Sequence, residues 1–192
     1  MIKIGVTGGI GSGKSMVCSI LERMGFPVFY SDRVAKELLN SDSDIKNQLI
    51  ELFGKDAYGI EGLDRAFIAR QIFSDKSQIE KINSIIHPKV RANFVEWTSH
   101  QTSKIVFNEA AILFETGAYK TFDATILVTS PHDLKIKRIM QRDHSNEAEI
   151  LGRMNNQWSD EQKIQLATYV ISNDEQHGLL EQIEKVILIL NS

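Results

Sequence analysis

The spacing of hydrophobic residues at the N-terminus predicts a strand, a loop and a helix. Apolar, β-prone residues occupy alternate positions from Ile2 to Val6, as expected of a strand. A glycine-rich stretch follows, and the apolar residues of 17–24 then recur three and four positions apart, on one side of a helix that stops at Gly25. Residues 27–30 read as a second strand, and a further helix begins at Val34.

The middle of the chain carries a helical pattern. From about residue 42 to residue 101 the strand signal disappears, and apolar residues repeat at helical spacing. Pro88 suits the first turn of a helix, so His87 and Pro88 are expected to end one helix and start the next. We therefore expect a helical region over about residues 41–102.

Strands and helices alternate again in the C-terminal half, where short apolar runs are typical of strands covered on both faces of a parallel sheet. The predicted elements are a strand at 105–107, a strand at 125–128, a helix opened by Pro131, a helix over 146–157 and a strand at 169–171. Residues 179–190 are helix-periodic, and although 186–190 alone fits a buried strand, their length favours a helix. The pattern predicts an α/β fold with a five-stranded parallel sheet flanked by helices.

Composition and charge exclude several classes of protein. The chain has 192 residues, of which 42% are hydrophobic and 24% charged, which fits one globular domain with an inserted sub-domain. The net charge of −3 gives no general attraction to nucleic acid or to an anionic membrane. Cys18, the one cysteine, cannot form an internal disulfide, and no signal peptide or membrane-spanning run is evident. We expect a cytoplasmic protein that binds neither nucleic acid nor membrane.

Residues 8–15, GGIGSGKS, satisfy the phosphate-binding P-loop pattern G-x-x-x-x-G-K-[ST]. A loop that turns successive backbone N–H groups inward around a triphosphate needs angles that glycine adopts, and it ends at a helix N-terminus that favours anions. Lys14 is expected to reach the β- and γ-phosphates of ATP, and the Ser15 hydroxyl to bind Mg²⁺. The other expected nucleotide-binding residues of this loop are Gly9, Gly11, Ser12, Gly13 and Met16.

The P-loop alone does not separate kinases from GTPases and ATPases. No Asn-Lys-x-Asp guanine motif occurs, and the one Asp-x-x-Gly, residues 56–59, lies in the helical region, so a switch GTPase is disfavoured. Few residues remain after the fifth strand for a domain that couples hydrolysis to a partner. A small-molecule kinase is favoured; the alternatives are a nucleoside-monophosphate kinase and a nucleotide-dependent binding module without transfer activity.

Two further features have both a functional and a plain structural interpretation. Asp32 follows the second strand, at the edge of the sheet where ligands of α/β folds bind, and it is either a catalytic base or a helix N-cap. Lys135, Arg138 and Arg142 share one face of a predicted helix, either as cations for the transferred phosphoryl group or as a solvated surface.

At this point the sequence resembles the dephospho-coenzyme A kinase family nearly end to end. The resemblance is carried by the P-loop and by short motifs in a fixed order: Ser31-Asp32, Leu63-Asp64-Arg65-Ala66, Ile72-Phe73-Ser74-Asp75, Ile86-His87-Pro88-Lys89-Val90, Leu113-Phe114-Glu115-Thr116-Gly117, Gln141-Arg142-Asp143, Gln157 and Val170-Ile171-Ser172-Asn173. Three positions depart from the family pattern. Tyr30 replaces an Asp, Met16 replaces a Thr that bonds the nucleotide, and Ala111 replaces a Pro.

The resemblance implies an enzyme that transfers the γ-phosphoryl group of ATP to the ribose 3′-hydroxyl of dephospho-coenzyme A, with Mg²⁺. It implies a single P-loop kinase domain over 1–192, with a nucleotide-binding core at about 1–40, 103–134 and 166–192, a substrate-binding region at about 41–102 and a lid at about 135–165. A monomer or a small homo-oligomer is expected.

The resemblance also implies residue roles. Asp32 is the expected base and a second candidate ligand of Mg²⁺, and Lys14 and Arg142 complete the expected catalytic set. The nucleotide is expected to contact Arg138 and Asn173, and the Asn173 amide is expected to read the edge of the adenine. Arg153 and Gln157 are weaker candidates for residues of the lid that contact the phosphates. The expected substrate-side residues are Asp32, Arg65, His87, Arg91 and Leu113.

Overall fold

The computed structural model describes residues 1–75 and 77–191. Lys76 and Ser192 lie outside the described residues, and Ser192 is the last residue of the predicted core. Contacts between residues divide the chain into two compact units. The first comprises Met1–Tyr30 with Gln101–Ser192, and the second comprises Ser31–His100. The helix after Tyr30, which the sequence assigns to the core, therefore groups with the second unit.

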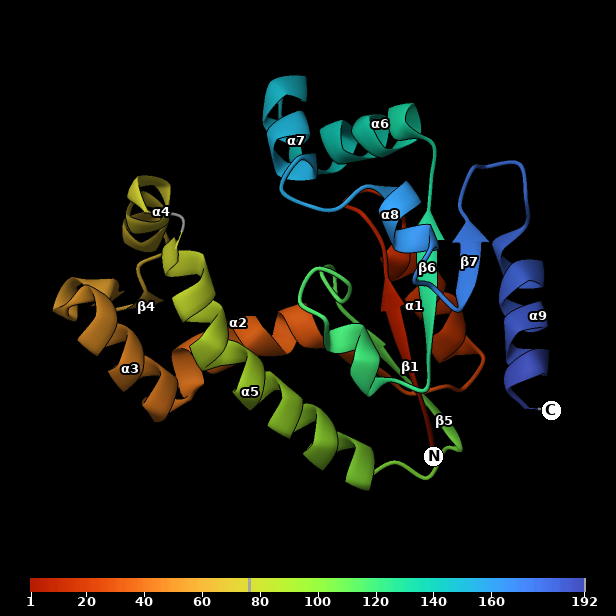
Figure 1. The fold of residues 1–192 in the computed structure, drawn as a ribbon, viewed down its shortest axis with the longest axis horizontal. Helices are drawn as coiled ribbons and strands as arrows, with labels where there is room; N and C mark the ends of the chain where they lie inside the picture. Colours follow the sequence, from red (N-terminus) through yellow and green to blue (C-terminus); the bar gives the residue numbers. More distant parts are fainter. Residues whose placement is uncertain (76, 192) are drawn as a thin grey trace. The chain divides into compact units, whose positions relative to one another are not determined.

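A five-stranded sheet forms the centre of the first unit (Figure 1). Its order is β2-β5-β1-β6-β7, and all four pairings are parallel. The strands are β1 (Ile2–Thr7), β2 (Val28–Tyr30), β5 (Ile105–Glu109), β6 (Ala124–Thr129) and β7 (Tyr169–Ser172). The predicted fold class and its five strands are confirmed.

Helices flank this sheet. The helical elements of the first unit are α1 (Lys14–Arg23), α6 (His132–Asp143), α7 (Glu147–Met154), α8 (Asp160–Ile164), α9 (Leu179–Leu190) and the 3₁₀ turn η2 (Ala118–Thr121). α1 packs on β1, β2 and α9, and α9 lies beside β7 in Figure 1. Their apolar sides meet the sheet in one core that includes Val17, Cys18 and Ile183. The predicted helix over 179–190 is confirmed, whereas α8 was not predicted.

Parallel strands end at the same edge of a sheet, and this edge collects the polar residues of the first unit. β1 leads into the P-loop, β5 ends at Glu109, and Ser130 and Asn173 directly follow β6 and β7. β1 and β6 are almost wholly buried along their lengths, so the loops that extend from them start from a fixed base.

The second unit is mainly helical, as predicted. Its elements are α2 (Ser31–Ser41), α3 (Ser43–Phe53), the 3₁₀ turn η1 (Lys55–Ala57), β3 (Tyr58–Gly59), β4 (Gly62–Leu63), α4 (Arg65–Ser74) and α5 (Ser77–Ser99). The antiparallel β3-β4 hairpin contradicts the expectation of a region without strands. Asn40 fixes this hairpin because its Oδ1 accepts a hydrogen bond from Leu63 N at 3.0 Å, and Tyr58 adds a bond of 2.7 Å to Leu39 O.

Pro88 does not start a helix, contrary to the prediction, and lies inside α5. A proline there removes one backbone hydrogen bond. Ile86, Val90 and Phe94 are buried at helical spacing on both sides of it, so packing holds the helix through the proline. Lys89 adds ion pairs, with its Nζ at 2.8 Å from a carboxylate oxygen of Asp44.

In the described part of the chain, no helix is both long enough and apolar enough to cross a membrane.

Candidate functional site

The P-loop connects β1 to α1 in the conformation that a phosphate cradle requires. Gly11 and Gly13 have φ of 78° and 94°, values that residues with a Cβ rarely adopt. Ser12 N donates to Gly9 O at 3.1 Å, which closes the turn, and α1 begins directly after Gly13. The N-terminus of α1 therefore points its first N–H groups toward the loop.

The P-loop also packs too closely for larger residues. A Cβ added to Gly13 would lie 1.9 Å from Asn173 Nδ2, and one added to Gly8 would lie 2.3 Å from Val128 O. At Gly11 the nearest atom would be Lys135 O at 2.8 Å. The glycines thus allow the positive φ angles of the loop and the close approach of neighbouring atoms to its backbone, as the spacing of the motif predicts.

The Lys14 side chain lies across the P-loop and bonds its backbone. Its Nζ donates to Gly8 O at 2.9 Å and to Gly9 O at 3.4 Å. These structural partners of Lys14 were not predicted from the sequence. They hold the ammonium group above the loop, while Ser15 and Met16 are exposed in the first turn of α1.

Asn173, directly after β7, and Arg138, in the middle of α6, brace the loop. Asn173 Nδ2 donates to Ser12 O at 2.9 Å, and Arg138 Nη1 donates to Asn173 O at 3.2 Å and to Ser130 Oγ at 3.0 Å. The structure therefore gives the Asn173 amide a loop-holding contact. Its contact with adenine, and that of Arg138 with the nucleotide, stay predictions.

Arg142 and Arg153 share the carboxylate of Asp143, in the segment that the sequence predicts to be a lid. Arg142 Nε and Nη2 lie 2.6 and 3.0 Å from the two oxygens of Asp143, and Arg153 Nη1 lies 2.7 Å from one of them. Bonds to both guanidinium groups hold the pKa of Asp143 well below its usual range, and Asp143 in turn raises that of Arg142. The Arg142 side chain is 60% exposed, so this ion pair can open at little cost in free energy.

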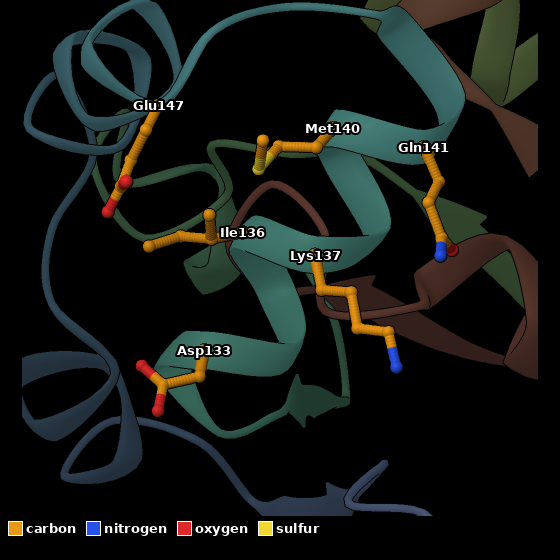
Figure 2. A pocket seen from close by; sticks show the side chains of 6 residues that line it. All are labelled: Asp133, Ile136, Lys137, Met140, Gln141 and Glu147. Atoms are coloured by element: carbon orange, nitrogen blue, oxygen red, sulfur yellow. The ribbon is translucent and has the colours of Figure 1, made fainter.

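The three basic residues predicted to share one face of α6 do not form one solvated face. Lys135 is buried and forms a short ion pair with Asp160, whereas Arg138 is partly buried and Arg142 exposed. A shallow groove follows another side of α6 toward Glu147 (Figure 2). The residues of α6 that line this groove are Asp133, Ile136, Lys137, Met140 and Gln141.

A buried ion pair that sequence reasoning missed lies near α8. Lys163 Nζ is 2.8 Å from Glu115 Oε1, and the Lys163 side chain is 0% exposed. The same carboxylate oxygen accepts a hydrogen bond of 3.1 Å from Trp158 N. A lysine in a polar segment reads as a surface residue, so only the Leu-Phe-Glu motif could have drawn attention to this pair.

Glu109 was also missed. It ends β5, directly opposite Val6 in β1 and Tyr30 in β2. Burial raises the pKa of Tyr30 and of Cys18, and the negative charge of Glu109 adds to both shifts. The signal in the sequence was an acid at the end of an apolar strand, a position that holds Mg²⁺ in other P-loop proteins.

The remaining predicted residues lie in several places. In the second unit, Asp32 is exposed in the first turn of α2, Arg65 begins α4, and His87 and Arg91 are one turn apart on α5. Burial lowers the pKa of His87, the Arg91 charge acts in the same direction, and the Asp32 carboxylate opposes both. In the first unit, Leu113 is buried against Gly5, so its predicted contact with substrate stays a prediction.

We expect His87 to make stability depend on pH. Its folded pKa lies below the ordinary 6.5, so as pH falls below 6.5 the unfolded chain takes up the proton first and the free energy of unfolding decreases. The loss levels off below the folded pKa. Urea denaturation across this range should show a weaker pH dependence for His87→Gln than for wild type. His100→Gln, at an exposed histidine just beyond α5, is the control, and an unchanged slope in His87→Gln would contradict the assignment.

A parallel sheet with a P-loop between β1 and α1, and with polar groups along its carboxyl edge, is the arrangement of the P-loop kinase fold. The family model for dephospho-CoA kinase matches residues 2–178, and this chain belongs to that family. The Bacteroides fragilis dephospho-CoA kinase is 38% identical over 98% of this chain and 93% of its own, and that of Chlorobaculum tepidum is 39% identical over 96% and 90%.

Solved structures agree with this assignment. A Thermus thermophilus protein has a TM-score of 0.89 at 34% identity and covers 100% of this chain and 98% of its own. The dephospho-CoA kinase of Campylobacter jejuni has a TM-score of 0.71 at 27% identity over 98% of this chain and 96% of its own. Shikimate kinase from Bacteroides thetaiotaomicron, at 14% identity and a TM-score of 0.52, shares the fold.

Proposed function

We propose that this protein transfers the γ-phosphoryl group of ATP to the ribose 3′-hydroxyl of dephospho-coenzyme A, giving coenzyme A and ADP. The observation that carries the proposal is the P-loop, in which Lys14 spans the loop and glycines supply the backbone angles, within a chain that matches its family along nearly all its length. ATP is the donor that this loop fits.

Mg²⁺ is proposed as the metal. Ser15 offers an exposed hydroxyl beside the loop, and Glu109 ends a neighbouring strand, so the chain supplies the oxygen ligands that Mg²⁺ prefers. Among residues 1–75 and 77–191 no cluster of three or more His, Cys, Asp or Glu could hold a metal, which fits an ion bound largely through nucleotide phosphates. Asp32 is a further candidate ligand. The bound ion would neutralise charge on the phosphates.

The acceptor side is assigned to the helical unit. Asp32 is proposed to accept the proton of the ribose hydroxyl, while His87, Arg65 and Arg91 meet anionic groups of dephospho-coenzyme A. Arg142, in the lid, is proposed to stabilise charge on the transferred group. Closure of the lid would exclude water, which otherwise competes for the phosphoryl group. A cytoplasmic enzyme, as a monomer or small homo-oligomer, completes the proposal.

Measuring ADP release with and without dephospho-coenzyme A tests the function. Release that depends on dephospho-coenzyme A and yields coenzyme A is expected. Release with nucleoside monophosphates would instead support a nucleoside-monophosphate kinase, and ATP binding without turnover of any acceptor would support a binding module.

Arg142→Ala is expected to lower kcat more than it raises the KM for dephospho-coenzyme A, because a cation aimed at the transferred phosphoryl group gains most of its interaction in the transition state. Steady-state kinetics check this, with Arg23→Ala, an exposed arginine at the end of α1, as the matched control. An unchanged kcat in Arg142→Ala would show that Arg142 is a surface residue without a part in phosphoryl transfer.

A further inference from the structure

The segment that joins α7 to α8 makes a direct hydrogen bond to the P-loop. Gln157 Oε1 accepts a hydrogen bond from Ile10 N at 2.9 Å. Ile10 lies between Gly9 and Gly11, at the start of the stretch whose N–H groups surround the phosphates. A side chain from the lid is therefore fixed to the loop at one defined amide.

Buried contacts hold Gln157 in this place. Trp158, the next residue, donates its backbone N–H to Glu115, and Lys163 pairs with the same oxygen from a wholly buried position. Breaking such a pair leaves a buried charge unpaired, so the ion pair stabilises this geometry of the segment. Lys135 and Asp160 add a second ion pair nearby.

The hydrogen bond to Ile10 determines which end of the Gln157 amide is free. Only the carbonyl oxygen can accept from a backbone N–H, so the Nε2 group keeps its two donor hydrogens. Among residues 1–75 and 77–191, nothing accepts a hydrogen bond from Nε2. The residue faces a cavity of about 550 Å³ that is also lined by Gly9, Ile10, Lys135 and Trp158.

We propose that Gln157 is a catalytic residue that donates a hydrogen bond from Nε2 to an oxygen of the transferred phosphoryl group, while Oε1 keeps the Ile10 amide in place. Phosphoryl oxygens are acceptors only, so they match the free end of the amide. In the reaction, the bond from the γ-phosphorus to the leaving ADP oxygen breaks and the bond to the ribose oxygen forms, and Gln157 neither gains nor loses a proton. Glu115 and Lys163 are positioning residues. This inference rests on the proposed function.

Gln157→Glu separates the two ends of the side chain. The variant keeps the length and an oxygen for Ile10 N–H, but it replaces the donor with a negative charge. Since removal of one preorganised donor costs about 10²–10³-fold in kcat, we expect a loss of at least about 10²-fold with the melting temperature and ADP affinity little changed. The kcat of the variant relative to wild type should rise as pH falls, because a protonated carboxyl group is neutral and donates again.

Two comparisons make the outcome decisive. Gln165→Glu places the same charge a few residues along the segment, at an exposed side chain directly after α8, and should keep activity within about twofold. Gln157→Ala removes both contacts and should be slow as well. If Gln157→Glu turns over within threefold of wild type while Gln157→Ala is slow, Gln157 only holds the loop and the proposal fails. A wild-type enzyme inactive on dephospho-coenzyme A would instead overturn the proposed function.

Discussion

Lys14→Ala is expected to abolish turnover while the protein stays folded. In the proposed mechanism its ammonium group binds the β- and γ-phosphates, and loss of this charge removes stabilisation where negative charge concentrates. The group also bonds Gly8 O and Gly9 O, but these carbonyls lie in a loop at the edge of the sheet and not in the core. Nucleotide affinity should fall together with kcat, as measured by ATP titration and steady-state kinetics.

Lys137→Ala is the matched control for Lys14→Ala. Lys137 also lies on a helix of the first unit, and Figure 2 shows its exposed side chain extending from α6. Its removal should leave kcat unchanged. Melting temperatures of both variants separate loss of activity from loss of fold, and near-normal activity in folded Lys14→Ala protein would end the phosphate-cradle assignment.

Asp32→Asn is expected to lower kcat by about 10²–10³-fold. The change keeps the size of the side chain but removes its charge and its capacity to accept a proton, and a general base contributes about 10²–10⁴-fold. The lower part of that range is expected because phosphoryl transfer passes through a loose transition state, so the hydroxyl loses its proton late. Tyr30 sharpens the test, since a phenol stands where the family has a second carboxylate.

The control for Asp32→Asn is Asp133→Asn. Asp32 and Asp133 are each the second residue of a helix, α2 and α6, so both variants lose a similar interaction with the helix N-terminus. Only Asp32→Asn should lose turnover. Nucleotide titration should give nearly equal affinity for both proteins, and a kcat of Asp32→Asn within threefold of wild type would remove Asp32 from the mechanism.

Much of the fold was predictable because its determinants are local. Strands covered on both faces appear as short apolar runs, and β1, β5, β6 and β7 lie where such runs occur. The P-loop was predictable because its geometry depends on glycines at fixed spacing. Residues that are neighbours in the sequence specify these features, so the features can be predicted from short stretches of the chain.

The β3-β4 hairpin was not predictable because each of its strands has two residues, too few for a periodic pattern. Its position depends on Asn40, from a helix that precedes it by many residues. Pro88 was misread for a related reason. The rule that proline opens helices is local, whereas burial of Ile86 and Val90 carries α5 past it.

The site was only partly predictable, because its support comes from pairs far apart in the chain. Glu115 with Lys163, Lys135 with Asp160 and Gln157 with Ile10 each join residues that carry no shared pattern. A charged residue in isolation reads as surface, and its burial is evident only when the partner is known.

Cys18 gives this enzyme a built-in reporter of its own opening. The thiol is 0% exposed between α1 and the sheet, and burial raises its pKa to about 12, so the reactive thiolate is scarce in the folded state. A thiol reagent can therefore reach it only when α1 separates from the strands. Because α1 begins at Lys14 of the P-loop, the labelling rate of the unmodified enzyme follows how firmly the nucleotide cradle is anchored, and it can be followed while ligands are added.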